Sequence, residues 1–109
     1  MTLEEVKAML DKTGLPVVYR EWPQNPEEGL PPPLPWLCYL VRRGNHFAAD
    51  GIVYYAAPVI DVELYSADKD PVSESAVEAV LTAAGLFYSK TEIWLEDEKM
   101  YEILYETEV

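Results

Sequence analysis

A proline-rich segment at residues 23–35, PQNPEEGLPPPLP, limits the folds open to this chain. Proline fixes one backbone angle and lacks the N–H that helices and sheet ladders need, so neither helix nor strand is expected here. The three prolines at 31–33 favour extended polyproline geometry. A loop of this length is unusual in a small domain. Two interpretations stay open: a stiff spacer, or an arm that contacts another subunit or a partner.

Helices are expected at residues 2–13 and 71–84. Thr2 stands where a capping residue is needed, and apolar residues follow it at helical spacing. Asp70 is suited to the N-cap of the second helix and Pro71 to its first position.

The remaining segments with β propensity predict a sheet. Ile60, Val62 and Leu64 alternate with polar residues, which is typical of a strand with one buried face and one solvent-exposed face. Pro58 should interrupt or end its ladder. The order α-β-β-β-α-β-β predicts one α+β domain, residues 1–109, with two helices packed on one face of a largely antiparallel sheet. The strands are expected at residues 17–22, 36–42, 52–65, 86–94 and 99–108.

The net charge of the chain limits the classes of partner that it is expected to bind. Its 109 residues carry 20 acidic and 8 basic side chains, a net charge of −12. Nucleic acid and anionic membranes both attract Lys and Arg, so direct binding to either is not expected. Such a charge discourages random self-association, and any assembly must use a specific surface.

Catalytic chemistry finds little support among the side chains. His46, the only histidine, precedes Asp50 by four residues, but glycines and Asn45 mark a turn rather than a helix, so no catalytic pair is expected. Cys38, the only cysteine, lies in a strand-like apolar run where burial makes a thiol inert. The chain is therefore expected not to be an enzyme.

Metal and cofactor sites are not expected either. One histidine and one cysteine cannot form a structural zinc site. The sequence DKD at 68–70 resembles the start of a calcium loop, but Ser73 and Ala79 stand where glycine and glutamate are required. Glycine-rich phosphate loops are absent from the sequence.

Targeting signals are not expected. Glu4 and Glu5 stand where a signal peptide would be basic, and no apolar run approaches the length of a membrane span. A single cysteine fits a reducing compartment.

Three stretches carry a resemblance to a known family. They are N-x-F-x-A-D-G-x-V-Y at 45–54, ELY-x-x-x-K-D-P at 63–71 and EKMYEILYE at 98–106. Together with the order of the other elements, they make the chain resemble the small tail-completion proteins of long-tailed phages and prophages of Gram-positive bacteria. These are also called tail terminators or head–tail joining proteins.

The resemblance implies a virion structural protein without catalytic residues. Such proteins form a ring, generally a hexamer, on the head-proximal end of the tail tube, and they join it to the head connector. The implied partners are further copies of this chain, the tail tube protein and head connector proteins. The implied location is the virion, after assembly in the host cytoplasm. From the proline-rich segment and the stretch at 45–51, rather than from the resemblance, subunit or partner contacts are expected at Leu30, Pro32, Trp36, Asn45, His46, Phe47 and Asp50.

Other functions remain open. A head-side connector or adaptor of similar size is the nearest alternative. An acidic inhibitor that mimics DNA belongs to a different class, and it would need carboxylates lining one face. The acidic residues here alternate along strands and cap helices, which argues against that alternative.

Overall fold

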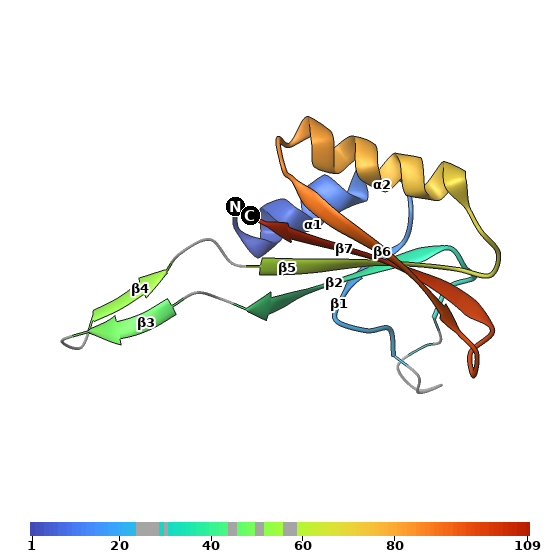
Figure 1. Ribbon diagram of the computed structural model, residues 1–109, viewed down its shortest axis with the longest axis horizontal. Helices are drawn as coiled ribbons and strands as arrows, with labels where there is room; N and C mark the ends of the chain where they lie inside the picture. The colour runs from blue at the N-terminus through green and yellow to red at the C-terminus, as the bar shows by residue number, and fades with distance from the viewer. Residues whose placement is uncertain (24–28, 30, 44–45, 50–51, 56–58) are drawn as a thin grey trace.

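The computed structural model describes residues 1–23, 29, 31–43, 46–49, 52–55 and 59–109, and describes no side chains between residues 43 and 58. These residues form helices and strands that make a two-layer α+β domain (Figure 1). The elements, in chain order, are α1 (Leu3–Asp11), β1 (Val17–Tyr19), β2 (Trp36–Arg43), β3 (His46–Ala49), β4 (Ile52–Tyr55), β5 (Val59–Ser66), α2 (Pro71–Ala83), β6 (Tyr88–Leu95) and β7 (Met100–Glu108).

Both helices begin where local capping chemistry predicts. The amide of Glu5 donates to the Thr2 hydroxyl at 3.1 Å, and the amide of Thr2 donates back to the Glu5 carboxylate at 2.9 Å. Asp70 caps α2 by accepting from the amide of Ser73 at 3.1 Å. These contacts satisfy N–H groups that have no partner inside the helix, which is why each helix starts there.

The main sheet has five strands in the order β1-β2-β5-β7-β6. Every neighbouring pair is antiparallel except β1 and β2, which run parallel. The prediction of an α+β fold is confirmed, and the predicted largely antiparallel sheet differs in detail, because the parallel pair of β1 and β2 makes it mixed. The long connection through residues 20–35 carries the chain back so that β2 starts beside the start of β1. Arg20, at φ 73°, ends β1 earlier than the predicted boundary.

The strand predicted at 52–65, which Pro58 is expected to interrupt, does not form one continuous element. The structure divides it into β4 and β5, and residues 56–58 between them, including Pro58, lie outside the described residues. The segment 46–49, expected as part of a loop, is the strand β3. The described residues therefore form two more strands than the predicted order has.

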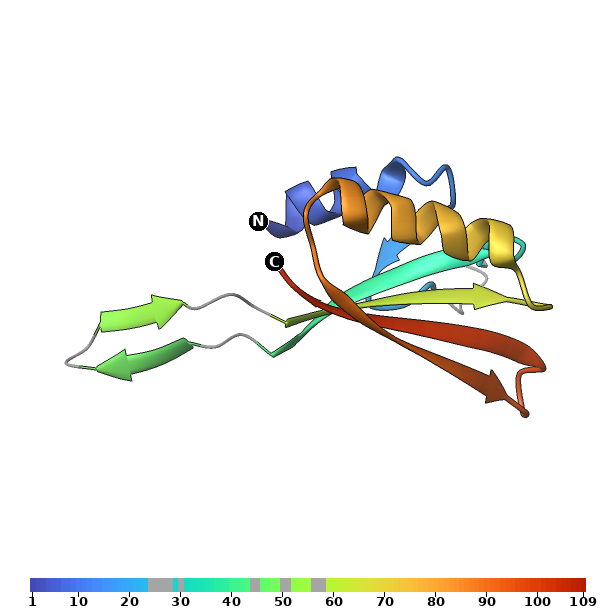
Figure 2. The same ribbon diagram turned by 45° about the horizontal axis from the view of Figure 1, so that its top comes forward.

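The core lies between the helices and one face of the main sheet (Figure 2). Ile60, Val62 and Leu64 of β5 are buried there, as their alternation predicts. The opposite face of β5 is less exposed to solvent than expected, because Asp61 is only 6% exposed. The other fully buried core residues include Val6, Leu10, Leu37, Val77, Leu81, Ile103 and Tyr105.

Strands β3 and β4 form a separate antiparallel two-stranded sheet, here named the ribbon. Figures 1 and 2 show the ribbon lying beyond the end of the main sheet and away from both helices. It follows β2 and precedes β5, so it is an extension of the hairpin that these two strands form.

Candidate functional site

The ribbon holds part of the predicted contact surface. His46 and Phe47 begin β3, where they pair with Tyr55 and Tyr54 of β4. Their side chains are not described. Leu30, Asn45 and Asp50 lie outside the described residues. The expected contacts at these positions therefore stay predictions.

Trp36, another predicted contact residue, begins β2 within an aromatic cluster. Its ring centroid lies 4.7 Å from that of Tyr65 and 6.1 Å from that of Trp22, in a T-shaped arrangement with Trp22. Pro32, from the proline-rich segment, is half-buried. The structure thus uses Trp36 inside the subunit to pack neighbouring segments together.

The face of the main sheet that points away from the helices, here named the open face, is acidic. Alternation along β5 and β7 places Asp61, Glu63, Glu102 and Glu106 on it. Arg42 of β2 bridges two of these side chains, with nitrogen–oxygen distances of 2.9 Å to Asp61 and 2.7 Å to Glu106. Asp61 stays buried because its Oδ2 is paired in this way, whereas its Oδ1 has no hydrogen-bond partner among the described residues.

Elsewhere on the open face, two carboxyl groups lie beside the hydroxyl of Tyr65. Its hydroxyl lies 2.8 Å from Glu102 Oε1 and also within hydrogen-bond distance of Glu63 Oε2. Burial raises the pKa of Glu63, and the neighbouring charge of Glu102 raises it further, while the hydrogen bond with Tyr65 opposes the change. Burial and both carboxylates raise the pKa of Tyr65, so its phenol stays protonated.

Cys38 lies on the same face and is 3% exposed. Burial, followed by the negative charge of Glu63, raises the pKa of its thiol to about 12. The thiolate is the nucleophilic form of cysteine, so this thiol is poorly suited to covalent chemistry.

We expect Cys38 to resist Ellman's reagent in the native protein at about pH 8. With a pKa of about 12, roughly one thiol in ten thousand is ionised at that pH. In denaturant the same thiol should react at the rate of a free cysteine. Native protein that reacts as fast as denatured protein would contradict this account of the site.

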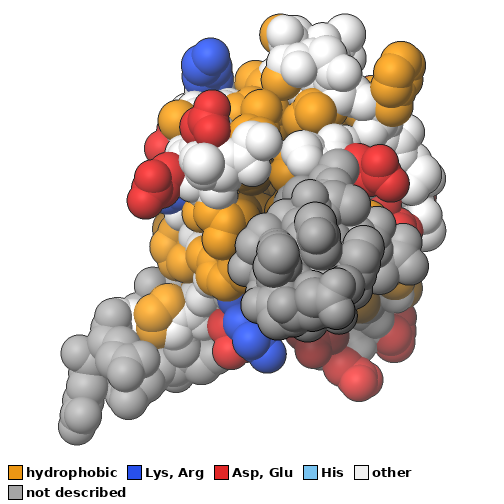
Figure 3. Space-filling view, turned by 90° about the vertical axis from the view of Figure 1, so that its left-hand side faces the viewer, with side chains coloured by type: hydrophobic (Ala, Val, Ile, Leu, Met, Phe, Trp, Pro, Cys, Tyr) orange, Lys and Arg blue, Asp and Glu red, His pale blue; other side chains and the backbone are white. Residues whose placement is uncertain are grey.

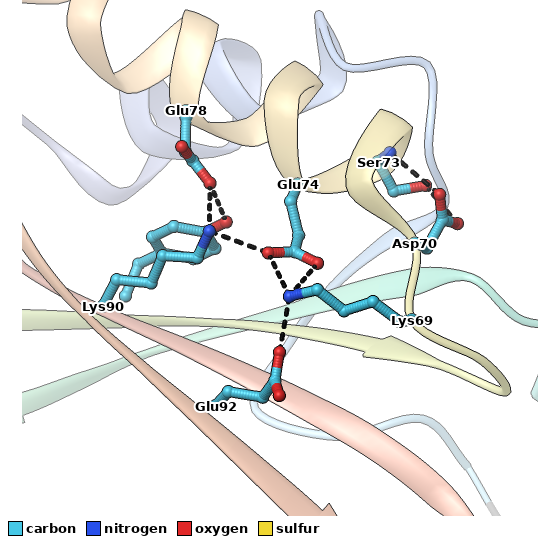
Figure 4. Close-up of polar contacts among 8 residues, drawn as sticks. Lys69, Asp70, Ser73, Glu74, Glu78, Lys90 and Glu92 are labelled. Atoms are coloured by element: carbon cyan, nitrogen blue, oxygen red, sulfur yellow. Dashed lines mark hydrogen bonds and ion pairs between the residues drawn. The ribbon is translucent and has the colours of Figure 1, made fainter.

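A network of charged side chains joins α2 to β6 (Figure 4). Glu74 is 4% exposed and forms ion pairs with Lys69 at 2.8 Å and with Lys90 at 2.7 Å. Lys90 also reaches Glu78 at 2.8 Å, and Lys69 reaches Glu92 at 2.5 Å. The buried carboxylate of Glu74 therefore has two opposite charges beside it, which offset part of its desolvation cost.

The electrostatics of this network favour a structural role. Burial raises the pKa of Glu74, but the hydrogen bonds from Lys69 and Lys90 outweigh it, and the net change is downward. Hydrogen bonding to Glu74 raises the pKa of both lysines. Lysines held protonated in this way cannot act as bases or nucleophiles. The spacing of Glu74 and Glu78 by one helical turn is one weak signal for this network in the amino-acid sequence.

An open groove of about 540 Å³ lies at the end of the main sheet where the ribbon is attached. Its lining includes Val59, Leu86, Tyr88 and Thr107, and Phe87 stands beside them with 94% of its surface exposed. Figure 3 views the molecule from this end and shows hydrophobic side chains gathered there, with acidic side chains around them. Exposed apolar surface of this kind is a feature of protein–protein contact sites.

Metal ligands do not gather in the part of the chain that the structure describes: no group of three His, Cys, Asp or Glu side chains there could hold an ion. Neither described helix combines the length and the apolar character that crossing a bilayer requires. No family model, curated protein or solved structure matches the chain.

Proposed function

We propose that this protein is a non-enzymatic phage structural protein that closes the head-proximal end of the tail tube as a ring and mediates head–tail joining. The proposal draws on the resemblance of residues 45–54, 63–71 and 98–106 to the tail-completion proteins. It also draws on the surfaces described above, which are suited to contacts between subunits.

The observation that carries the proposal is the position of the ribbon. Strands β3 and β4 pair with each other and not with the main sheet. A two-stranded sheet on its own is only marginally stable in water and gains stability when it packs against another surface. Because the ribbon lies beyond the body of its own subunit (Figure 1), a neighbouring subunit or the tail tube would supply that surface.

In each contact between neighbouring subunits, the surface that receives the ribbon would lie on the main sheet. Strand β6 is an edge strand whose outer side pairs with no other described strand, and most of its residues are exposed. The exposed Phe87 lies just before it. An edge strand accepts another strand by main-chain pairing. A head-to-tail contact between two different surfaces closes into a ring when its rotation is correct, without open-ended growth.

Native mass spectrometry of the purified chain, alone and with tail tube protein, tests this proposal. The expected result is a ring of six copies, formed alone or on the end of the tube. A phage that lacks the protein should make overlong or unjoined tails. Normal free tails with leaky heads would instead indicate a head-side connector, and a monomer that never associates with the tube would reject the ring.

Deleting residues 26–34 tests the proline-rich segment as an arm. If the segment contacts a neighbour, the deletion should abolish ring formation and give tails of uncontrolled length, while the core remains folded by circular dichroism. Replacing the same residues by a Gly/Ser linker of equal length separates a spacer from an arm, because a flexible linker restores only the connection. Unchanged assembly of the deletion variant would reject the arm.

The acidic mimic of DNA is a second candidate, and the open face favours it. Asp61, Glu63, Glu102 and Glu106 share that face because β5 and β7 are neighbours in the sheet, a pairing that the alternation along each strand does not predict. Arg42 neutralises part of this charge, so the mimic ranks second. Salt-sensitive binding to a DNA-processing enzyme, with no effect on tails, would place the mimic first.

A further inference from the structure

The hydroxyl of Tyr65 lies between two carboxyl groups. It cannot donate a hydrogen bond to both of them, because it has a single proton. It contacts Glu63 on its own strand and Glu102 on β7, the latter at 2.8 Å. A phenol has one proton to donate, whereas an ionised carboxylate can only accept. Both contacts are hydrogen bonds only if one of the two carboxyl groups keeps a proton and donates it.

The surroundings of this group favour a retained proton. Glu63 is half-buried, and Asp61 stands two residues away on the same strand face. On β2, Trp36 packs on the ring of Tyr65, and the buried Cys38 lies opposite Glu63. Arg42 is the basic side chain described on this face, and its guanidinium is engaged by Asp61 and Glu106. No described cation therefore pairs with Glu63 or Glu102, and two like charges in contact are unfavourable.

We infer that Glu63 and Glu102 hold one proton between them through the hydroxyl of Tyr65, so that the open face contains a pH-sensitive site. Loss of the proton places two carboxylates around one phenol. The repulsion should then loosen the contact between β5 and β7 at this position and the packing of Trp36 on Tyr65. This inference concerns the single subunit and does not depend on the proposed function.

The sign of the effect follows from the upward change in the pKa of Glu63. The folded chain binds this proton more tightly than the unfolded chain, in which the pKa is near 4.5. The stabilisation is fully present below that ordinary value and is lost as the pH rises through the higher folded value. Most paired carboxylates show the opposite behaviour, because their pKa is lowered by folding.

An NMR titration of the glutamate carboxyl carbons tests the site directly in the wild-type protein. We expect Glu63 to titrate above the ordinary glutamate range, together with a change in tryptophan fluorescence. Glu63→Gln keeps a donor and removes the titration, so it should abolish both signals and raise the melting temperature above that of the wild type at about pH 8. Glu98→Gln, in the exposed turn before β7, is the control for charge and should retain both signals.

Two results would overturn the inference. One is titration of Glu63 within the ordinary glutamate range in the wild type, which needs no variant to fold. The other is a fluorescence transition that persists at the same pH in Glu63→Gln, because that variant has no shared proton to lose.

Discussion

Excision of the ribbon is expected to leave a folded subunit that no longer assembles. Arg43 and Val59 are direct partners in the antiparallel ladder between β2 and β5. Replacing residues 44–58 by Asn-Gly would therefore join them by a two-residue turn of the kind that such strands favour. Because β3 and β4 pair with each other and lie beyond the main sheet (Figure 1), circular dichroism and the melting temperature should change little.

Ring assembly, by contrast, should be lost when the ribbon is excised. Under the proposed function, the excised variant is expected to run as a monomer by native mass spectrometry and to leave tails uncapped. The turn between β6 and β7 offers a matched control, because Leu95 and Met100 are also ladder partners. Replacing residues 96–99 by Asn-Gly makes the same kind of change at the other end of the sheet and should leave rings intact. Rings of normal mass from the ribbon excision would show that β3 and β4 are not the assembly surface.

Truncation of Tyr105 is expected to have the largest effect on stability. Tyr105 is the largest fully buried side chain among the described residues, and its hydroxyl donates to Glu78 at 2.8 Å. Tyr105→Ala leaves a cavity beneath α2 and should lower the free energy of unfolding by about 3–5 kcal/mol. For a domain of this size that is a large part of the total. Urea unfolding followed by circular dichroism measures it.

Two further variants separate packing from hydrogen bonding at this site. Tyr105→Phe removes only the hydroxyl and should cost about 1–2 kcal/mol. Tyr101→Ala removes a half-buried ring from the same strand and should cost less than Tyr105→Ala. Equal losses from Tyr105→Phe and Tyr105→Ala would mean that the contact with Glu78, and not ring packing, dominates.

Local chemistry accounts for the parts of the fold that could be predicted. The caps of both helices depend on residues three positions apart, so Thr2 and Asp70 specify them without help from the rest of the chain. The buried face of β5 follows from the alternation of Ile60, Val62 and Leu64.

What the sequence alone determined, therefore, is the α+β class, the helix starts and one face of the sheet, because each depends on neighbours along the chain. Only the tertiary structure decided the parallel pairing of β1 with β2, the separate ribbon, the lysine network around Glu74 and the meeting of Glu63 with Glu102. These features join residues far apart in the chain. Their geometry depends on strand order and register, which alternation and propensity do not specify.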